Sequence, residues 1–331
     1  MADLVPTIDL SPWFGSDPGD RSRLVAEVDE ACRTIGFFCA VGHRQPAADF
    51  AALYALTKAF FRQPLERKRR VAQPAPDQIR GYIAYGAAAL GYTMGMRTPP
   101  DWKESFSIGP VDVDRADPYF AGSGSRTHFA ANLWPDDPPG FQAAWTRGYR
   151  NFAALADTIL EIFARALGQP ANFFRASTDR AISIMGAMYY PDQPTAPLPG
   201  QLRAGPHTDF GTITLLRPDG APGGLQVRAP SGEWAAVQAP EDGFVVNIGD
   251  LLSRWSGGRW ASTLHRVVNP PPDRRAGTER LSIGFFHKPN YDALIDYLPG
   301  CRPTAGALPA VLAGDHIYRQ FTSQALEAAR P

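Results

Sequence analysis

Residues 206–211 read Pro206-His207-Thr208-Asp209-Phe210-Gly211. If Pro206–Phe210 is extended, His207 and Asp209 point to the same face, because side chains alternate along a β-strand. A second histidine stands in His265-Arg266-Val267, far enough downstream for several antiparallel strands to intervene. The pattern therefore predicts a β-rich fold that brings two histidines and one carboxylate together.

Two histidines and one carboxylate form a recognised set of metal ligands. The set leaves about three positions of an octahedral ion open, which is typical of non-haem Fe(II) sites. The same three residues with a water molecule could instead hold zinc. A His-x-Asp pattern also occurs by chance, and a single histidine such as His207 is most often structural. The pattern alone makes these residues candidates.

A possible carboxylate-binding pair follows in Arg280-Leu281-Ser282. Arg280 and Ser282 share one face if this apolar run is a strand. A guanidinium that points into a protein interior needs an anion, since an unpaired buried charge is costly. Its planar fork matches a carboxylate, to which Ser282 can add a hydrogen bond. The alternative is a structural ion pair between Arg280 and a surface carboxylate. A zinc site would leave this pair unexplained.

The chain after Pro170 alternates short β-prone runs with turns. Turn signals include Pro218-Asp219-Gly220 and Pro270-Pro271-Pro272. Many short strands in this rhythm predict a sandwich or barrel, and a double-sheet jelly roll fits them. The expected strands are Met185–Tyr190, Thr212–Leu216, Leu225–Val227, Phe244–Ile248, Leu264–Val268 and Leu281–Phe286.

The N-terminal half is expected to be mainly helical. Apolar residues recur at helical spacing over residues 24–35 and 47–61, with a short apolar strand at Gly36–Val41 between them. Residues 80–135 are rich in Gly, Pro, Ser and Asp and predict long loops. The most regular helix is expected at residues 141–167, with most of its aromatic side chains in the core.

Composition narrows the class of protein. The chain has 331 residues, with 33 basic and 33 acidic side chains, so its balance favours neither nucleic acid nor an anionic membrane as a partner. Its three cysteines form no CxxC pattern, which fits reduced thiols in a cytoplasm. The N-terminal residues do not resemble a signal peptide, and no apolar run reaches the roughly 20 residues of a membrane helix. We expect a cytoplasmic protein.

Further motifs stand in a fixed order along the chain. They are Val5–Leu10, Gly36-Phe37-Phe38, Gly42-His43, Asp101–Phe106, Tyr189-Tyr190-Pro191, Gly223–Val227, Asn247–Asp250 and Trp255. Together with the histidine, aspartate and Arg-x-Ser patterns, this ordered set resembles the isopenicillin N synthase-like family of Fe(II)/2-oxoglutarate-dependent oxygenases. The resemblance covers most of the chain.

The resemblance implies an α+β fold with a mainly β core. That core would be a distorted double-stranded β-helix, or jelly roll, wrapped by N-terminal helices. Residues 1–120 would form the helix-rich N-terminal region. Residues 121–331 would form the jelly-roll core with a C-terminal tail, in one compact catalytic unit.

The resemblance also implies the cofactor and the co-substrates. His207, Asp209 and His265 would ligate Fe(II). Arg280 and Ser282 would bind the distal carboxylate of 2-oxoglutarate, and O2 would be the second co-substrate. The implied enzyme is a dioxygenase that hydroxylates or desaturates a small organic molecule and releases succinate and CO2.

One departure from the family concerns the tyrosine at Tyr190, which matches a family residue that helps to bind the co-substrate. Many members have an asparagine two residues before this tyrosine and an arginine further upstream. This chain has Met188 and Gly186 there, so the hydrogen bond of that asparagine must be lost or replaced. Asn247 and Asp250 are interpreted as holding a turn.

The substrate is expected to be a small molecule bound in the barrel mouth. Phe286 shares a strand face with the Arg-x-Ser pair and is a candidate for the substrate pocket. Tyr82, Phe106 and Tyr291 are weaker candidates. An aromatic lining would favour a substrate of apolar or ring character. The sequence identifies neither the substrate nor the oligomeric state.

Three alternatives use the same residues differently. An oxidase of the isopenicillin N synthase type cyclises its substrate without 2-oxoglutarate and uses the Arg-x-Ser pair for the substrate carboxylate. An ethylene-forming enzyme fragments 2-oxoglutarate itself. A non-catalytic protein would use the barrel only as a ligand cup, but it would have no need for all three metal ligands.

Overall fold

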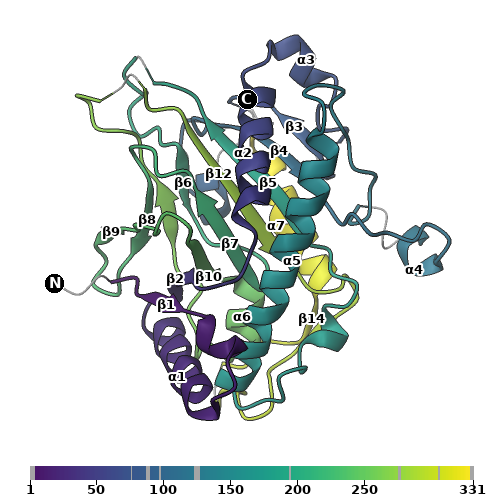
Figure 1. The fold of residues 1–331 in the computed structure, drawn as a ribbon, viewed down its shortest axis with the longest axis vertical. Coiled ribbons are helices and arrows are strands. Elements are labelled where there is room, and N and C mark those ends of the chain that lie inside the picture. The colour runs from purple at the N-terminus through teal and green to yellow at the C-terminus, as the bar shows by residue number, and fades with distance from the viewer. Residues whose placement is uncertain are drawn as a thin grey trace.

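The computed structural model describes residues 4–75, 77–86, 90–96, 98–122, 127–193, 195–274, 277–304 and 306–328. Two β-sheets form its centre (Figure 1). The larger sheet has eight strands, in the order β1 (Thr7–Asp9), β2 (Phe37–Val41), β10 (Phe244–Ile248), β7 (Ile213–Pro218), β12 (Arg280–His287), β5 (Ile184–Tyr190), β4 (Glu104–Ile108) and β3 (Gly81–Ile83). The smaller sheet has four, in the order β6 (Ala204–His207), β11 (His265–Val267), β8 (Leu225–Arg228) and β9 (Trp234–Ala236).

The two sheets face each other across an apolar layer. Phe37 and Val245 from the larger sheet pack in one buried cluster with Val227 and Val267 from the smaller sheet. Two facing sheets of this kind make a jelly roll, which confirms the predicted fold class. The space between the sheets contains the site described below.

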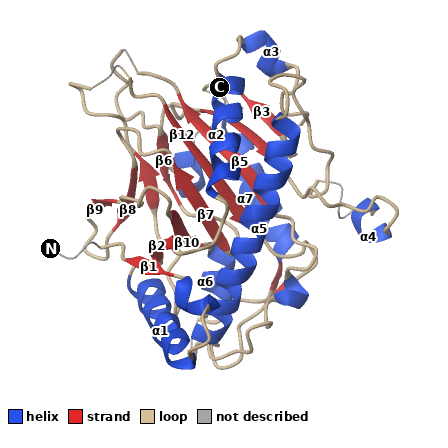
Figure 2. Cartoon of the chain, in the orientation of Figure 1, coloured by secondary structure: helices blue, strands red, loops and turns tan. Residues whose placement is uncertain are grey.

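Helices cover the other face of the larger sheet, as the colouring in Figure 2 shows. The longest is α5 (Phe141–Ala166), which packs beside α2 (Ala47–Phe61) and contacts β12 and β7. The predicted helix at residues 141–167 is thus confirmed, and its aromatic side chains Trp145 and Phe152 are fully buried. The remaining helices are α1 (Pro18–Thr34), α3 (Leu65–Arg69), α4 (Pro118–Ala121), α6 (Asp250–Trp255) and α7 (Ala313–Ala328), with short 3-10 turns at Ser11–Phe14, Leu90–Met94 (η2) and Arg175–Ser177.

Strand β12 shows how one strand serves two layers. Leu281, Ile283 and Phe285 belong to the core cluster on the helix side. Arg280 and Ser282 point the opposite way, into the space between the sheets. This alternation is the expected period of two, so the strand separates an apolar core from a polar site.

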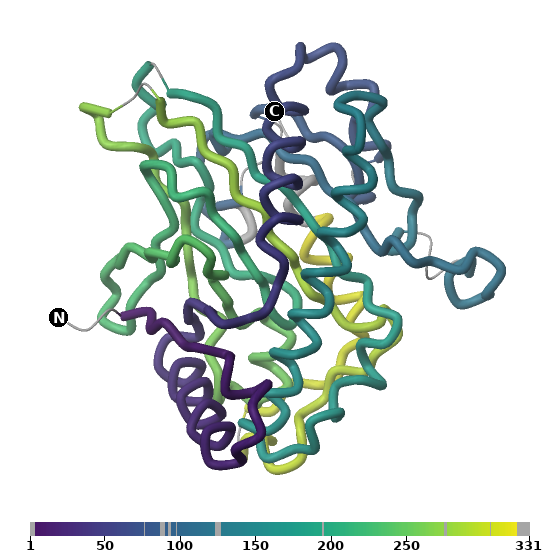
Figure 3. The backbone as a smooth tube through the Cα atoms, in the orientation of Figure 1, coloured from purple at the N-terminus to yellow at the C-terminus, as the bar shows by residue number. Residues whose placement is uncertain are grey.

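Segments that are distant in the sequence meet in the larger sheet. The purple N-terminal strand β2 lies beside the green strand β10 in Figure 3, and the two pair antiparallel, with Phe244 opposite Ala40. Gly36, which precedes β2, has a φ of 68°, and a Cβ there would lie 2.1 Å from the carbonyl oxygen of Ala261. A residue with a side chain could not make this close approach.

Residues 80–135 contain more regular structure than the sequence predicted. Strands β3 and β4 pair with each other in this region, and β4 joins β5. Strands from residues 1–120 therefore extend the same sheet that residues 121–331 build. A third, two-stranded sheet consists of β13 (Leu294–Ile295) and β14 (Val311–Leu312). Within the described ranges, the helices are too short or too polar to cross a bilayer.

Candidate active site

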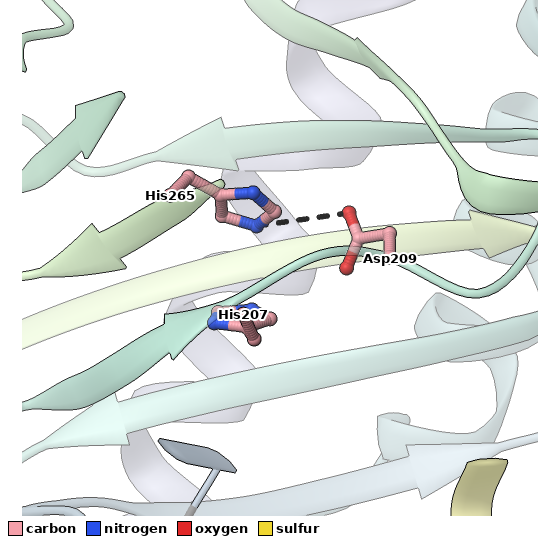
Figure 4. A group of neighbouring side chains, drawn as sticks. All are labelled: His207, Asp209 and His265. Carbon is pink, nitrogen blue, oxygen red and sulfur yellow. Dashed lines mark ion pairs between the residues drawn. The ribbon is translucent and has the colours of Figure 1, made fainter. Parts of the chain in front are cut away.

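Three side chains converge between the two sheets. The ligand atoms of His207, Asp209 and His265 all lie within 4.8 Å of one another. Figure 4 shows the three side chains turned toward a common centre, and His265 Nε2 lies 3.8 Å from Asp209 Oδ2. Asp209 and His265 are buried, with 8% and 6% of their surface exposed. Two imidazoles and one carboxylate so arranged fit an octahedral ion that keeps open positions.

The smaller sheet positions the two histidines. His207 ends β6 and lies directly opposite His265 of β11 in the antiparallel register, and the ring centres are 4.3 Å apart. Asp209 lies beyond the strand, because β6 ends at His207 rather than extending to Phe210 as the sequence suggested. The backbone of Asp209 is held instead by the amide of Asp250, which donates to its carbonyl oxygen at 2.8 Å.

Backbone carbonyls orient both imidazole rings. His207 Nδ1 lies 2.7 Å from the carbonyl oxygen of Gly205, and His265 Nδ1 lies 3.1 Å from that of Thr263. A carbonyl only accepts hydrogen bonds, so each Nδ1 carries the proton and each Nε2 keeps a free lone pair. This is the tautomer that a metal-binding histidine needs.

The electrostatic surroundings suit a cation. Burial, and next the proximity of His265, lower the pKa of His207 to about 4, so its imidazole is neutral near pH 7. Burial alone would raise the pKa of Asp209, but the two histidines and a hydrogen bond from Asn247 lower it overall. A neutral histidine and an ionised carboxylate are the protonation states that bind metal.

Asn247 and Asp250 contact this site directly. Asn247, in β10, donates from Nδ2 to Asp209 Oδ2 at 2.7 Å. Asp250, at the start of α6, accepts hydrogen bonds from Thr208 Oγ1 at 3.3 Å and Ser262 Oγ at 2.6 Å. The interpretation that Asn247 holds a turn is therefore corrected, because Asn247 orients a candidate ligand from within the larger sheet.

Arg280 has the properties of a carboxylate-binding residue. It is 5% exposed, and its Nη1 donates to the carbonyl oxygen of Ala221 at 2.9 Å. Its Nε is buried without a partner, and no carboxylate among the described residues forms an ion pair with it. The structure thus contradicts the alternative of a structural ion pair. A buried guanidinium with uncommitted donors calls for an anion.

Tyr190 and Arg203 surround this guanidinium. Tyr190 lies opposite Arg280 in the register of β5 and β12, and burial raises the pKa of its phenol. The guanidinium of Arg203 stacks 5.6 Å from the Tyr190 ring centre. Burial, and next the charge of Arg280, lower the pKa of Arg203 to about 10. Two cations and a neutral phenol therefore share one end of the site.

One cavity of about 580 Å³ contains all six of the candidate metal and co-substrate residues. Serines from β4 (Ser105 and Ser107) and Thr214 from β7 add hydroxyl groups to its wall. Most of the remaining lining is apolar. The apolar lining residues include Ile79, Ile83, Leu90, Ile184, Met188, Leu216, Leu225, Val267, Phe286 and Phe321. Such a cavity suits a small organic molecule with a few polar groups.

Of the four aromatic residues proposed for the substrate pocket, one lines the cavity and three do not. Phe286 lines the cavity. Tyr82 and Phe106 are instead 2% and 0% exposed within the core cluster, where Phe106 packs on Trp145 with ring centres 4.9 Å apart. Tyr291 packs on Tyr119. None of these three borders the cavity, so the expected positions of Tyr82, Phe106 and Tyr291 are corrected.

The sequence interpretation missed two lysines in the cavity wall, Lys103 and Lys288. Lys103 Nζ forms an ion pair with Asp101 at 3.0 Å. Lys288 is 7% exposed, and burial, followed by the charge of Arg80, lowers its pKa to about 7. The alternation of β12 could have revealed Lys288, because it continues the row of Arg280, Ser282 and Phe286.

Two family profiles together match most of the chain. Residues 5–137 match a family described as non-haem dioxygenase in morphine synthesis, N-terminal. Residues 181–289 match the 2OG-Fe(II) oxygenase superfamily. The second range contains the three candidate metal ligands together with Arg280 and Ser282.

Individual relatives are similar to this chain along most of its length. The 2-oxoglutarate-Fe(II) type oxidoreductase hxnY of Emericella nidulans is 34% identical over 300 residues, covering 89% of this chain and 82% of that protein. The validamycin A dioxygenase of Streptomyces hygroscopicus subsp. limoneus is 31% identical, covering 97% and 86%. The crystal structure of Neurospora crassa T7H in complex with alpha-KG and thymine superposes with a TM-score of 0.84 at 28% identity, covering 96% of each chain. The names of two of these relatives include small molecules, validamycin A and thymine.

Proposed function

The chain belongs to the 2-oxoglutarate- and Fe(II)-dependent oxygenases, and from that premise we propose that His207, Asp209 and His265 hold its iron. The enzyme oxidises a small organic molecule with O2, while 2-oxoglutarate is converted to succinate and CO2. The observation that carries the proposed ligand set is the convergence of three ligand atoms within 4.8 Å in the wall of one cavity.

We further propose that Arg280, Ser282 and Tyr190 bind 2-oxoglutarate. Arg280 has one buried donor, Nε, without a partner among the described residues, and Ser282 follows it on the same face of β12. The Arg280 fork would receive the distal carboxylate of 2-oxoglutarate. Ser282 and the protonated phenol of Tyr190 would each donate a hydrogen bond to it. Met188, which replaces the family asparagine, lies opposite Ser282 and adds an apolar wall there.

The bound iron, with 2-oxoglutarate and O2, would supply the oxidising power to attack a C–H bond of the substrate. The residues of this chain orient the metal ligands and the substrate. The backbone carbonyls beside both histidines keep Nε2 aimed at the metal. Asn247 fixes the rotation of the Asp209 carboxylate. The apolar cavity wall excludes water and orients the substrate.

The relatives favour this activity over the alternatives that the sequence left open. Relatives named as 2-oxoglutarate-dependent dioxygenases support 2-oxoglutarate dependence over a cyclising oxidase or an ethylene-forming enzyme. We also propose that residues 1–120 and 121–331 act as one catalytic unit, since both contribute strands to the larger sheet. A cytoplasmic location fits the three free cysteines.

The ligand set is tested by anaerobic addition of Fe(II) and 2-oxoglutarate to the purified apoprotein. The expected result is a weak visible charge-transfer band in the wild type that is absent in Asp209→Ala. The matched control is Asp112→Ala, which removes an exposed carboxylate paired with Arg150 and should keep the band. A full-strength band in Asp209→Ala would overturn the proposed ligand set.

A further inference from the structure

Lys288 is the one lysine of this chain that forms no ion pair with a described residue. The sequence contains four lysines. Lys58 pairs with Asp219, Lys68 with Glu104 and Lys103 with Asp101. Lys288 forms no ion pair or side-chain hydrogen bond with any residue in the described part of the chain. It is nevertheless as deeply buried as Lys68, at 7% against 5% exposed.

The position of Lys288 is fixed by its backbone and its stem. Its amide donates to Ser183 Oγ at 3.1 Å. Its Cγ lies 3.2 Å from the point where a Cβ on Gly211 would stand, so the stem passes close over the turn that follows Asp209. Lys288 lines the main cavity and also a small adjoining cavity. The ammonium therefore stands beside the proposed metal site and opens to the ligand space.

The carboxylate whose charge acts on Lys288 is that of Asp209, which raises the pKa of the lysine, but Asp209 is a candidate metal ligand and forms no ion pair with Lys288. Arg80, which also lines the adjoining cavity, donates its guanidinium hydrogens to the carbonyl oxygens of Ile79, His128 and Ala130. Besides the candidate ligand Asp209, one described carboxylate borders either cavity, Asp77, and it forms no ion pair with Lys288. Lys288 and Arg80 therefore put two positive charges at this end of the cavity.

Lys288 and Arg280 cannot bind the same carboxylate. The two residues are eight positions apart along one extended segment, which puts their Cα atoms about 26 Å apart at about 3.3 Å per residue. A carboxylate that contacts the Arg280 guanidinium is therefore out of reach of the Lys288 ammonium. Lys288 is open to another anionic group in the cavity.

We propose that Lys288 binds a carboxylate of the primary substrate, so that the enzyme oxidises a small carboxylic acid with an apolar body. This inference rests on the proposed function, because it assigns the second ligand of the same site. The carboxylate would accept hydrogen bonds from the Lys288 ammonium, and its charge would favour the protonated lysine. The apolar body would lie against Phe286, Ile79 and Ile184, which line the same cavity.

The experiment is a thermal-shift screen of the protein loaded anaerobically with Fe(II) and 2-oxoglutarate. The probes are matched pairs of a small carboxylic acid and its primary amide, among them phenylacetate, 3-phenylpropionate and hexanoate. The wild type is expected to be stabilised by acids and not by their amides. Lys288→Met should lose this preference, and Lys288→Arg should retain it. Lys58→Met, which removes a half-buried lysine outside the cavity, is the matched control and should behave as wild type.

Three results of this screen would overturn the assignment. They are the absence of any stabilising acid at millimolar concentration, an equal response to acids and amides, and a preference for acids that survives in Lys288→Met. A weaker affinity of Lys288→Met for 2-oxoglutarate would also overturn it, since Lys288 would then bind the co-substrate. The visible band of the iron and 2-oxoglutarate complex reports separately on the proposed function. If the band forms and the acid preference does not, only the assignment of Lys288 fails.

Discussion

The side-chain amide of Asn247 donates a hydrogen bond of 2.7 Å to Oδ2 of Asp209. Asn247 lies in β10 of the larger sheet, whereas Asp209 follows β6 of the smaller sheet. The bond therefore joins the two sheets at the candidate metal site. It leaves Oδ1 free of this contact and fixes the rotation of the carboxylate before any metal arrives.

Asn247→Ala is expected to weaken Fe(II) binding by about 10–100-fold, the usual effect of removing a partner of a metal ligand. The measurement is an anaerobic Fe(II) titration followed by the visible band with saturating 2-oxoglutarate. The matched control is Asn151→Ala, whose side chain donates to Asp49 far from the cavity. An unchanged Fe(II) affinity in a folded Asn247→Ala protein would show that the hydrogen bond does not position Asp209.

Arg280→Lys is expected to raise the dissociation constant for 2-oxoglutarate by at least tenfold while Fe(II) still binds. Lysine keeps the charge but not the planar fork, so one of two parallel hydrogen bonds is lost, and a bond to a charged group contributes about 1.5–3 kcal/mol. The measurement is a 2-oxoglutarate titration of the iron-loaded protein. Arg150→Lys, at an exposed ion pair, should leave the constant unchanged. An unchanged dissociation constant in Arg280→Lys would show that Arg280 does not bind 2-oxoglutarate.

Local patterns were enough to predict the helices and most strands. The three-to-four-residue apolar repeat predicted α5 to within one residue, and short apolar runs predicted β5, β7, β8, β10, β11 and β12. The candidate ligands were also predicted, because a His-x-Asp motif and a distant histidine keep their order in any fold of this family. These features depend on residues close together in the sequence or on ordered motifs.

Features that depend on long-range pairing were not predicted. In β4, Ser105 and Ser107 face the cavity and Phe106 faces the helices. The sequence interpretation assigned the aromatic residue to the pocket because nothing local shows which face of a strand is covered by helices. The same holds for Lys288. Its lack of a carboxylate partner becomes visible only when every neighbour in space is known.

Phe106→Ala is expected to affect mainly stability, and Phe286→Ala mainly ligand binding. Phe106 is fully buried between Phe60, Phe141 and Trp145, so its removal should cost about 3–5 kcal/mol of unfolding free energy. Phe286 borders the cavity. Phe286→Ala should therefore cost less unfolding free energy, because it enlarges a space that already exists.

Urea unfolding measures the first effect, and the response of the iron- and 2-oxoglutarate-loaded protein to small ligands measures the second. Phe286→Ala should change which probes stabilise the protein. Phe106→Leu, the conservative core variant, should leave that selection as in the wild type. A changed probe selection in Phe106→Leu would contradict the placement of Phe106 in the core.

His287 makes stability depend on pH in a predictable direction. It is 2% exposed, and burial lowers its pKa to about 4 from an ordinary value of about 6.5. As the pH falls from about 6.5 toward 4, the unfolded chain binds a proton that the folded chain cannot accept, so the free energy of unfolding decreases. Above about pH 6.5 the imidazole is neutral in both states and this contribution does not change.

His287→Asn should therefore lose less stability than the wild type between pH 6.5 and 5, by at most about 2 kcal/mol, since one proton changes the free energy by about 1.4 kcal/mol per pH unit. The measurement is urea unfolding of metal-free protein in EDTA across this pH range, where the other histidines titrate alike in both proteins. Thr212→Val separates charge from contact, because Thr212 Oγ1 lies 2.6 Å from His287 Nδ1. Thr212→Val should lower the free energy of unfolding at every pH. The dependence of that free energy on pH should stay as in the wild type. If the free energy of unfolding changes equally with pH in His287→Asn and in the wild type, the folded protein accommodates a charged His287.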